Sequence, residues 1–136
     1  MKKIIVPLIV AGIVGLGPSA FAQLSREAAI AKAEAILKNL QDGKTADVVK
    51  EFDAKMAPQL PESKLAPVWK TLLSQFGTFK SITERREGQM QGRQAVELML
   101  AFEKETIVNR VVFDGEGKVS GLVFQPTSMA VLPANK

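Results

Sequence analysis

The apolar residues in the first half of the chain recur at helical spacing. They follow one another three or four positions apart within residues 25–43, 45–56 and 65–77. Such a stripe is typical of a helix that buries one face. The predicted buried positions are Ala29, Ala33, Ile36, Leu37, Leu40, Val48, Val49, Phe52, Met56, Leu65, Val68, Trp69, Leu72, Leu73 and Phe76. The pattern therefore predicts three consecutive helices.

The second half alternates between apolar and polar positions, as strands do. Residues 95–103, 106–113 and 119–125 each place an apolar side chain at nearly every second position. Residues 79–90 are more polar and carry basic side chains, which suit an edge strand that must not pair with other chains. Helices followed by strands predict an α+β fold, with three N-terminal helices packed on one face of a four-stranded antiparallel sheet.

The segment DGEGK, residues 114–118, joins the last two predicted strands. A calcium loop places oxygen ligands at alternate positions and ends in a distant glutamate. Here the alternation stops after Asp114 and Glu116, because Lys118 occupies the next position. Asp-Gly between alternating strands is instead typical of a hairpin turn, since glycine adopts a positive φ at little cost. We therefore expect a scaffold turn and no metal site.

The sheet face turned away from the helices is also predicted to be apolar. Its residues are Met99, Ala101, Val108, Val112, Val119 and Val123. A solvent-facing sheet surface would be more polar, so this face should be covered by a second copy, a partner domain or the apolar C-terminal tail, residues 127–136. The first hypothesis is a homodimer whose interface includes Met99, Val108, Val112 and Val123. The second is cover by the tail.

Aromatic and apolar residues on the helices and sheet form a second candidate site. Phe52, Met56, Trp69 and Phe102 could line a pocket for a small apolar ligand, or they could be ordinary core. Both interpretations stay open at this point.

The first 22 residues have the pattern of a signal peptide. Lys2 and Lys3 precede an apolar run, residues 4–17, and Ala20-Phe21-Ala22 has the small-x-small pattern of a cleavage site. We expect cleavage after Ala22 and export of a single domain, residues 23–136, to the periplasm or the medium. The alternative is an uncleaved N-terminal anchor. Residues 23–136 contain no apolar run long enough to span a membrane.

Missing residue types limit the possible chemistry. The chain has no Cys, His or Tyr, which excludes Ser-His, Cys-His and His-metal mechanisms, and no cofactor or catalytic residue is predicted. Charge is nearly balanced once residues 1–22 are removed, and no basic stripe favours nucleic-acid binding. Carboxylates such as Asp53 or Glu97 could serve an enzyme only if they were desolvated.

Three segments resemble a known family. Residues 33–53 (AEAILKNLQDGKTADVVKEFD), 60–82 (LPESKLAPVWKTLLSQFGTFKSI) and 111–124 (VVFDGEGKVSGLVF) resemble the small bacterial domain-of-unknown-function family 3887. That resemblance implies a fold similar to nuclear transport factor 2, the cystatin-like cone, in which a curved sheet wraps a long helix and leaves a cavity at its open end. Members occur as lone exported proteins or fused ahead of α/β-hydrolase domains, and the family supplies no catalytic residues.

Three functions follow as hypotheses. The first is a non-enzymatic binding or assembly module, with a small apolar ligand in the cone cavity, a protein partner on the sheet, or both. The second is a cavity isomerase or hydrolase that uses a lone carboxylate, Asp53 or Glu97. The third is an accessory to a separate envelope α/β-hydrolase. An ionisable group in the cavity would favour the enzyme, whereas an apolar cavity would favour binding.

Overall fold

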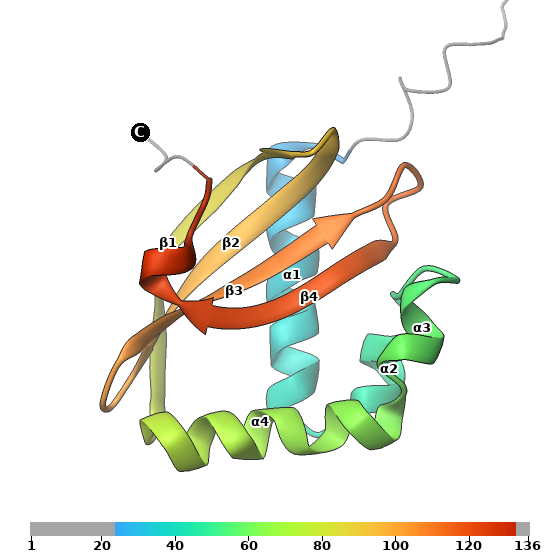
Figure 1. The fold of residues 1–136 in the computed structure, drawn as a ribbon. Helices are drawn as coiled ribbons and strands as arrows, with labels where there is room; N and C mark the ends of the chain where they lie inside the picture. Colours follow the sequence, from blue (N-terminus) through green and yellow to red (C-terminus); the bar gives the residue numbers. More distant parts are fainter. Residues whose placement is uncertain (1–23, 133–136) are drawn as a thin grey trace, which may run out of the picture.

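Helices occupy the first half of the chain and strands the second, as the residue pattern predicts. The computed structural model describes residues 24–132, so the predicted signal peptide lies outside it. Its elements are α1 (Arg26–Gln41), α2 (Thr45–Val49), α3 (Met56–Gln59), α4 (Glu62–Phe76), β1 (Phe79–Met90), β2 (Arg93–Phe102), β3 (Thr106–Phe113), β4 (Val119–Pro126) and the 3₁₀-helix η2 (Thr127–Met129) (Figure 1). The α+β class is confirmed, and a fourth short helix is added.

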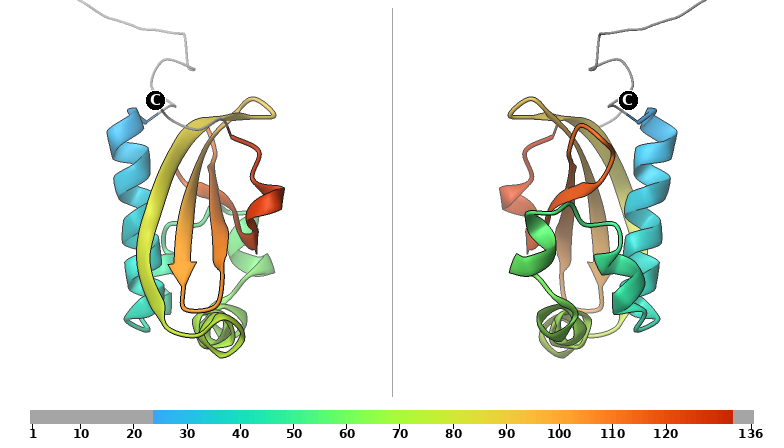
Figure 2. Two further views of the ribbon diagram at one scale, coloured as in Figure 1. Left: turned by 90° about the vertical axis from the view of Figure 1, so that its left-hand side faces the viewer. Right: turned by 90° about the vertical axis from the view of Figure 1, so that its right-hand side faces the viewer.

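The long helix α1 supplies the main cover of the sheet. The Ser25 hydroxyl accepts a hydrogen bond from the Ala28 backbone N–H and so caps its first turn. All five apolar positions predicted for this helix are buried, together with Ile30. Figures 1 and 2 show α1 running along one face of the sheet, where it contacts β1 and β2.

The predicted second helix is too long. α2 ends at Val49, and the chain then forms an isolated bridge in which Phe52 pairs with Val119 of β4. Two backbone hydrogen bonds hold this bridge, from Val119 N–H to Glu51 O and from Asp53 N–H to Val119 O. The apolar residues that predicted one continuous helix to Met56 therefore belong to three different elements: α2, the bridge and the start of α3.

Helix α4 crosses the end of the sheet rather than lying on its face (Figure 1). Leu65, Trp69 and Leu72 are buried, but Leu73, which was predicted to be buried, is exposed. A helix that crosses the strand ends buries a narrower stripe of its surface than a helix that lies flat on a sheet. Leu73 falls outside that stripe and is therefore exposed. An aromatic cluster of Trp69, Phe76, Phe79 and Phe102, with ring centroids 5.4–5.9 Å apart, joins α4 to β1 and β2.

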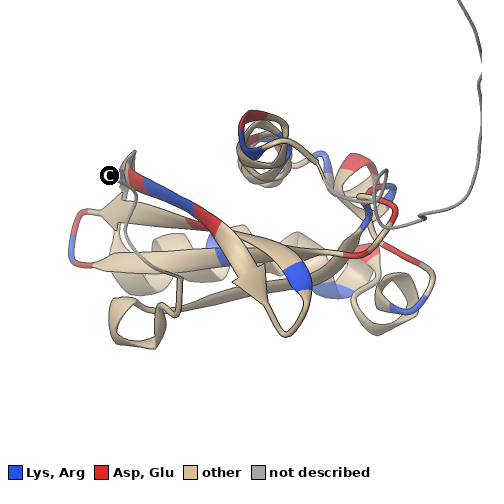
Figure 3. Cartoon of the chain, turned by 90° about the horizontal axis from the view of Figure 1, so that it is seen from above, with Lys and Arg blue, Asp and Glu red and all other residues tan. Residues whose placement is uncertain are grey.

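The four strands form an antiparallel meander in the order β1-β2-β3-β4. The sheet is curved, and its polar strand β1 is an edge, with acidic and basic residues side by side over 84–87 (Figures 2 and 3). A register shift after Val112 turns Val119 toward the helices, so Val119 is a core residue and does not belong to the second face. Among residues 24–132, no helix has the length and apolar character needed to cross a membrane.

Replacing Gly77 by alanine is expected to destabilise the protein clearly more than replacing Gly43. Both glycines have positive φ, which costs about 1–2 kcal/mol for any other residue. A Cβ at Gly77 would also lie 2.8 Å from the Cβ of Glu103, whereas one at Gly43 would meet nothing within 4 Å. Urea unfolding of Gly77→Ala and Gly43→Ala, followed by Trp69 fluorescence, measures the difference. Equal losses would mean that α4 and the β2–β3 turn are not held in this close contact.

Candidate functional site

The C-terminal segment covers the sheet face opposite α1. Figure 2 shows η2 and α1 on opposite sides of the sheet. From here on we call Thr127–Leu132, the described part of the predicted tail 127–136, the tail, and this side of the sheet the tail-covered face. The Leu132 side chain is only 3 % exposed, and its Cδ2 lies close to Gly88 of β1. Of the three covers left open by the sequence, the structure therefore contains the tail.

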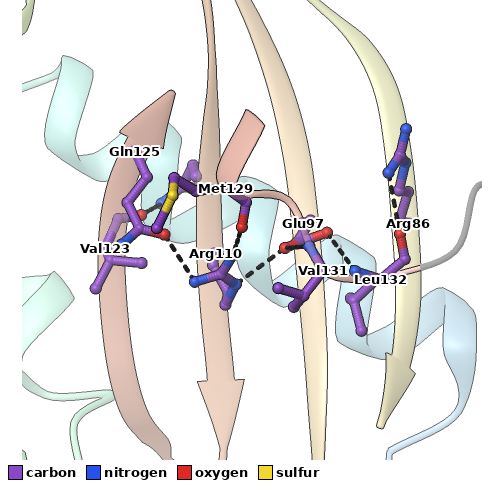
Figure 4. A network of polar contacts seen from close by, with 9 residues as sticks. Arg86, Glu97, Arg110, Val123, Gln125, Met129, Val131 and Leu132 are labelled. Carbon is purple, nitrogen blue, oxygen red and sulfur yellow. Dashed lines mark hydrogen bonds and ion pairs between the residues drawn. The ribbon is translucent and has the colours of Figure 1, made fainter. Parts of the chain in front are cut away.

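A buried ion pair holds the tail in place (Figure 4). Glu97 of β2 is 0 % exposed, and Arg110, its cross-strand partner on β3, donates from Nε to Glu97 Oε2 at 2.9 Å. The same carboxylate accepts the backbone N–H groups of Val131 and Leu132, each at 2.9 Å. Arg110 also donates from Nη2 to the Met129 carbonyl. Glu97 and Arg110 are therefore paired with each other, and both also form hydrogen bonds with the tail backbone.

A second arginine holds the tail at the sheet edge. Arg86 of β1 donates from Nη1 to the Leu132 carbonyl at 3.0 Å and from Nε to Glu84 at 2.7 Å. The hydrogen bond between Arg86 and Glu84 holds the pKa of the Glu84 carboxyl below its ordinary value and raises the pKa of the Arg86 guanidinium. Arg86 therefore stays charged while it holds the tail.

The residues predicted as a homodimer interface fall into two groups. Met99 and Val108 belong to the tail-covered face and are already buried within the single chain. Val112 is half-buried and Val123 is exposed. Only the latter two keep surface that a partner could contact.

An apolar cavity of about 290 Å³ opens where α4 meets the ends of β3 and β4. We call it the terminal cavity. It is lined by Leu72, Gln75, Phe76, Ile107, Phe124, Gln125 and Pro126. No ionisable side chain is among them, and its volume is at the lower limit of small-molecule sites. Its arrangement can hold a compact neutral molecule but offers no acid or base.

The four residues predicted as a ligand pocket do not come together in one cavity. Trp69 and Phe102 pack against each other, with ring centroids 5.6 Å apart, in the aromatic cluster. Phe52 lines a different, more polar cavity of about 410 Å³ beside the 114–118 turn, and Met56 begins α3, half-buried against the core. Trp69 and Phe102 reach the terminal cavity only through Phe76, which touches Phe102 and lines the cavity.

The carboxylates proposed for catalysis have structural partners. Asp53 Oδ1 accepts the backbone N–H groups of Lys55 and Met56 and so caps the start of α3. Asp114 was considered only as a cation ligand, and its Oδ1 accepts the backbone N–H groups of Glu116 and Lys118 and closes the hairpin turn. In that turn the positive φ falls on Gly117, the second glycine. Within residues 24–132 no group of three acidic, His or Cys side chains could hold a metal ion.

The family assignment follows from a direct match. The profile of a family described as a protein of unknown function (DUF3887) matches residues 33–122, about two thirds of the chain. The chain belongs to the DUF3887 family. No curated protein and no solved structure matches it, so the expected likeness to nuclear transport factor 2 stays a prediction.

The sequence of this DUF3887 protein did not predict three of its buried polar residues, Glu97, Asn109 and Arg110. Arg110 and Asn109 were not singled out, and Glu97 was considered only as a catalytic carboxylate. One signal was available: Asn109 occupies a helix-facing position between Ile107 and Val111, where the pattern calls for an apolar residue. All three polar residues lie inside the matched range, whereas the tail that Glu97 and Arg110 hold lies outside it.

Proposed function

We propose that this DUF3887 protein is an exported, non-enzymatic binding module that holds a small apolar ligand in the terminal cavity. The observation that carries the proposal is the lining of that cavity, which is apolar apart from two glutamines and has no ionisable group. Export rests on the signal-peptide pattern of residues 1–22.

The positions of the carboxylates support binding over catalysis. Glu97 lies on the tail-covered face, on the other side of the sheet from the cavity, and is neutralised by Arg110. Asp53 is used to cap α3 and lines the cavity beside the hairpin. A general acid or base must reach the reacting atom, and neither carboxylate lines the terminal cavity.

Filling the terminal cavity is expected to weaken binding of a neutral bicyclic probe. Gln75 is an exposed residue of α4 that lines the cavity, so Gln75→Trp places a large ring at its mouth without cutting into the core. Titration calorimetry with 2-methylnaphthalene should show at least tenfold weaker binding to Gln75→Trp, about 1.4 kcal/mol. Lys70→Trp, at an exposed position of the same helix that does not line the cavity, should bind as the wild type does. Equal affinity in all three proteins would remove this site from the proposal.

A second candidate is a homodimer through the outer surface of the tail-covered face. Four large apolar residues are exposed within residues 24–132, and three of them, Val123, Met129 and Val131, lie on this side. Val123 is the cross-strand partner of Arg110, whose guanidinium holds the Met129 carbonyl, so these residues are neighbours (Figure 4). Clustered exposed apolar residues are typical of an interface.

Val131→Lys is expected to dissociate such a dimer. Val131 is 56 % exposed, so lysine should leave the fold intact, but an unpaired charge buried in an interface costs several kcal/mol, roughly a hundredfold or more in affinity. The control is Leu73→Lys. Leu73 is the remaining one of the four exposed apolar residues and lies on α4, away from this face, so the substitution should leave the dimer intact. Light scattering measures the mass of each protein. A wild type that is monomeric at high concentration would rule out the dimer.

A further inference from the structure

A buried amide lies behind the terminal cavity, and one of its two polar atoms has no hydrogen-bond partner within residues 24–132. Asn109 of β3 is 0 % exposed, and its Nδ2 donates to the Val123 carbonyl at 3.2 Å. Its Oδ1 has no hydrogen-bond partner within residues 24–132. A carbonyl oxygen can only accept, so the Asn109 group that faces Val123 has to be the NH₂ group. The unused atom is therefore an acceptor.

The position of Asn109 connects this acceptor with the cavity. Phe124 stands directly opposite Asn109 across the β3–β4 ladder, and Ile107 lies two residues away on the same face of β3. Both side chains line the terminal cavity. Directly opposite residues have Cβ atoms about 5 Å apart, and neighbours on one face of a strand are about 7 Å apart. Asn109 consequently lies one side chain behind the inner wall of the cavity and does not itself line it.

Nothing else in the surroundings uses this acceptor. The core around it is apolar, with Leu98 as the cross-strand partner of Asn109 on β2. Leaving a buried acceptor unpaired is costly, and the large majority of buried polar atoms in proteins have a partner. Replacing Asn109 with an apolar residue would avoid that cost, so its presence points to a donor that arrives from outside the described chain.

We propose that the ligand of the terminal cavity is a neutral, mainly apolar molecule with one hydroxyl or N–H group, which donates to Asn109 Oδ1 between Ile107 and Phe124. This inference rests on the proposed function and names its ligand class. A neutral molecule fits because no charged group lines the cavity. A donor fits because the free atom is an acceptor. The other amides are less suited, since Gln125 Oε1 already accepts from Arg110 and Gln75 is exposed at the mouth.

Two ligands of nearly equal shape test the proposal. 2-Naphthol carries a hydroxyl donor where 2-methylnaphthalene carries a methyl group. Calorimetry gives the ratio of their association constants for the wild type, for Asn109→Leu and for Gln75→Leu. We expect the ratio to fall roughly tenfold in Asn109→Leu, because the donor then loses its acceptor, with 2-methylnaphthalene still bound. In Gln75→Leu the ratio should change by less than twofold.

The outcomes separate this inference from the proposed function. If both ligands bind and the ratio is the same in Asn109→Leu, the amide holds only a buried water and the ligand class is wrong, while the binding module stands. A fall confined to Gln75→Leu would place donor recognition at the mouth and would also overturn the inference. Failure of both ligands to bind the wild type would overturn the proposed function itself.

A spectroscopic measurement on the wild type avoids dependence on the folding of Asn109→Leu. In ¹⁵N-labelled protein, the Asn109 side-chain NH₂ resonances should shift clearly more with 2-naphthol than with 2-methylnaphthalene, whose ring current alone acts on them. Equal shifts with both ligands would contradict a hydrogen bond to Oδ1.

Discussion

Glu97→Ala is expected to lower the free energy of unfolding by about 3–5 kcal/mol, the largest single effect we predict. The substitution leaves Arg110, which is almost fully buried, without its ion-pair partner, and removing one partner of a buried pair is far costlier than removing both. The backbone N–H groups of Val131 and Leu132 lose their acceptor as well. Urea unfolding followed by Trp69, the single tryptophan of the chain, measures the loss.

Two comparisons make the result specific to burial. Glu84 pairs with Arg86 in a partly exposed position, so Glu84→Ala should destabilise the protein far less than Glu97→Ala does. The double variant Glu97→Met/Arg110→Met removes both buried charges and should be more stable than Glu97→Ala. A loss below about 1 kcal/mol for Glu97→Ala would mean that the ion pair is hydrated and the tail is loosely held.

Ending the chain at Pro126 is expected to produce a protein that aggregates and unfolds at clearly lower temperature. Without the tail, the sheet face that carries Met99 and Val108 loses the cover of η2, and Glu97 and Arg110 lose the backbone groups that complete their hydrogen bonding. Burial of the Leu132 side chain alone is worth about 1.5–3 kcal/mol. Thermal unfolding and size-exclusion chromatography would follow both effects.

A shorter deletion provides the control. A chain ending at Leu132 keeps each tail contact with Glu97, Arg110 and Arg86. It should unfold at the wild-type temperature and remain dispersed. A chain ending at Pro126 that behaved in the same way would show that the tail does not protect the sheet.

The period of the apolar residues was enough to predict most of the elements. Strand β3 begins and ends where the alternation over 106–113 places it, and β1 has the bounds predicted for the polar edge strand, 79–90. The error at the second helix has a physical cause, since Phe52 satisfies a helical spacing while its backbone neighbours, Glu51 and Asp53, bond to Val119. Spacing alone cannot distinguish a buried face of a helix from a buried bridge, because both require an apolar side chain at the same position.

The ion pair and the tail contacts of the tail-covered face were less predictable, because they join distant segments of the chain. The pairing of Glu97 with Arg110 depends on the register of the β2–β3 hairpin, and the bonds to Val131 and Leu132 span 34 and 35 residues. The apolar tail did indicate that the second face needed a cover. Asn109 was the exception, since a polar residue at a core position can be recognised from the alternation itself.

Chemical-shift mapping of the ¹⁵N-labelled protein with 2-methylnaphthalene is the decisive test of the proposed binding site, because it reports where a neutral apolar molecule binds. We expect saturable shifts at the backbone amides of Leu72, Phe76, Ile107 and Phe124, which surround the terminal cavity. Shifts centred instead on Phe52, Asp53 and Lys118, beside the hairpin, or no saturable shifts at all, would contradict it.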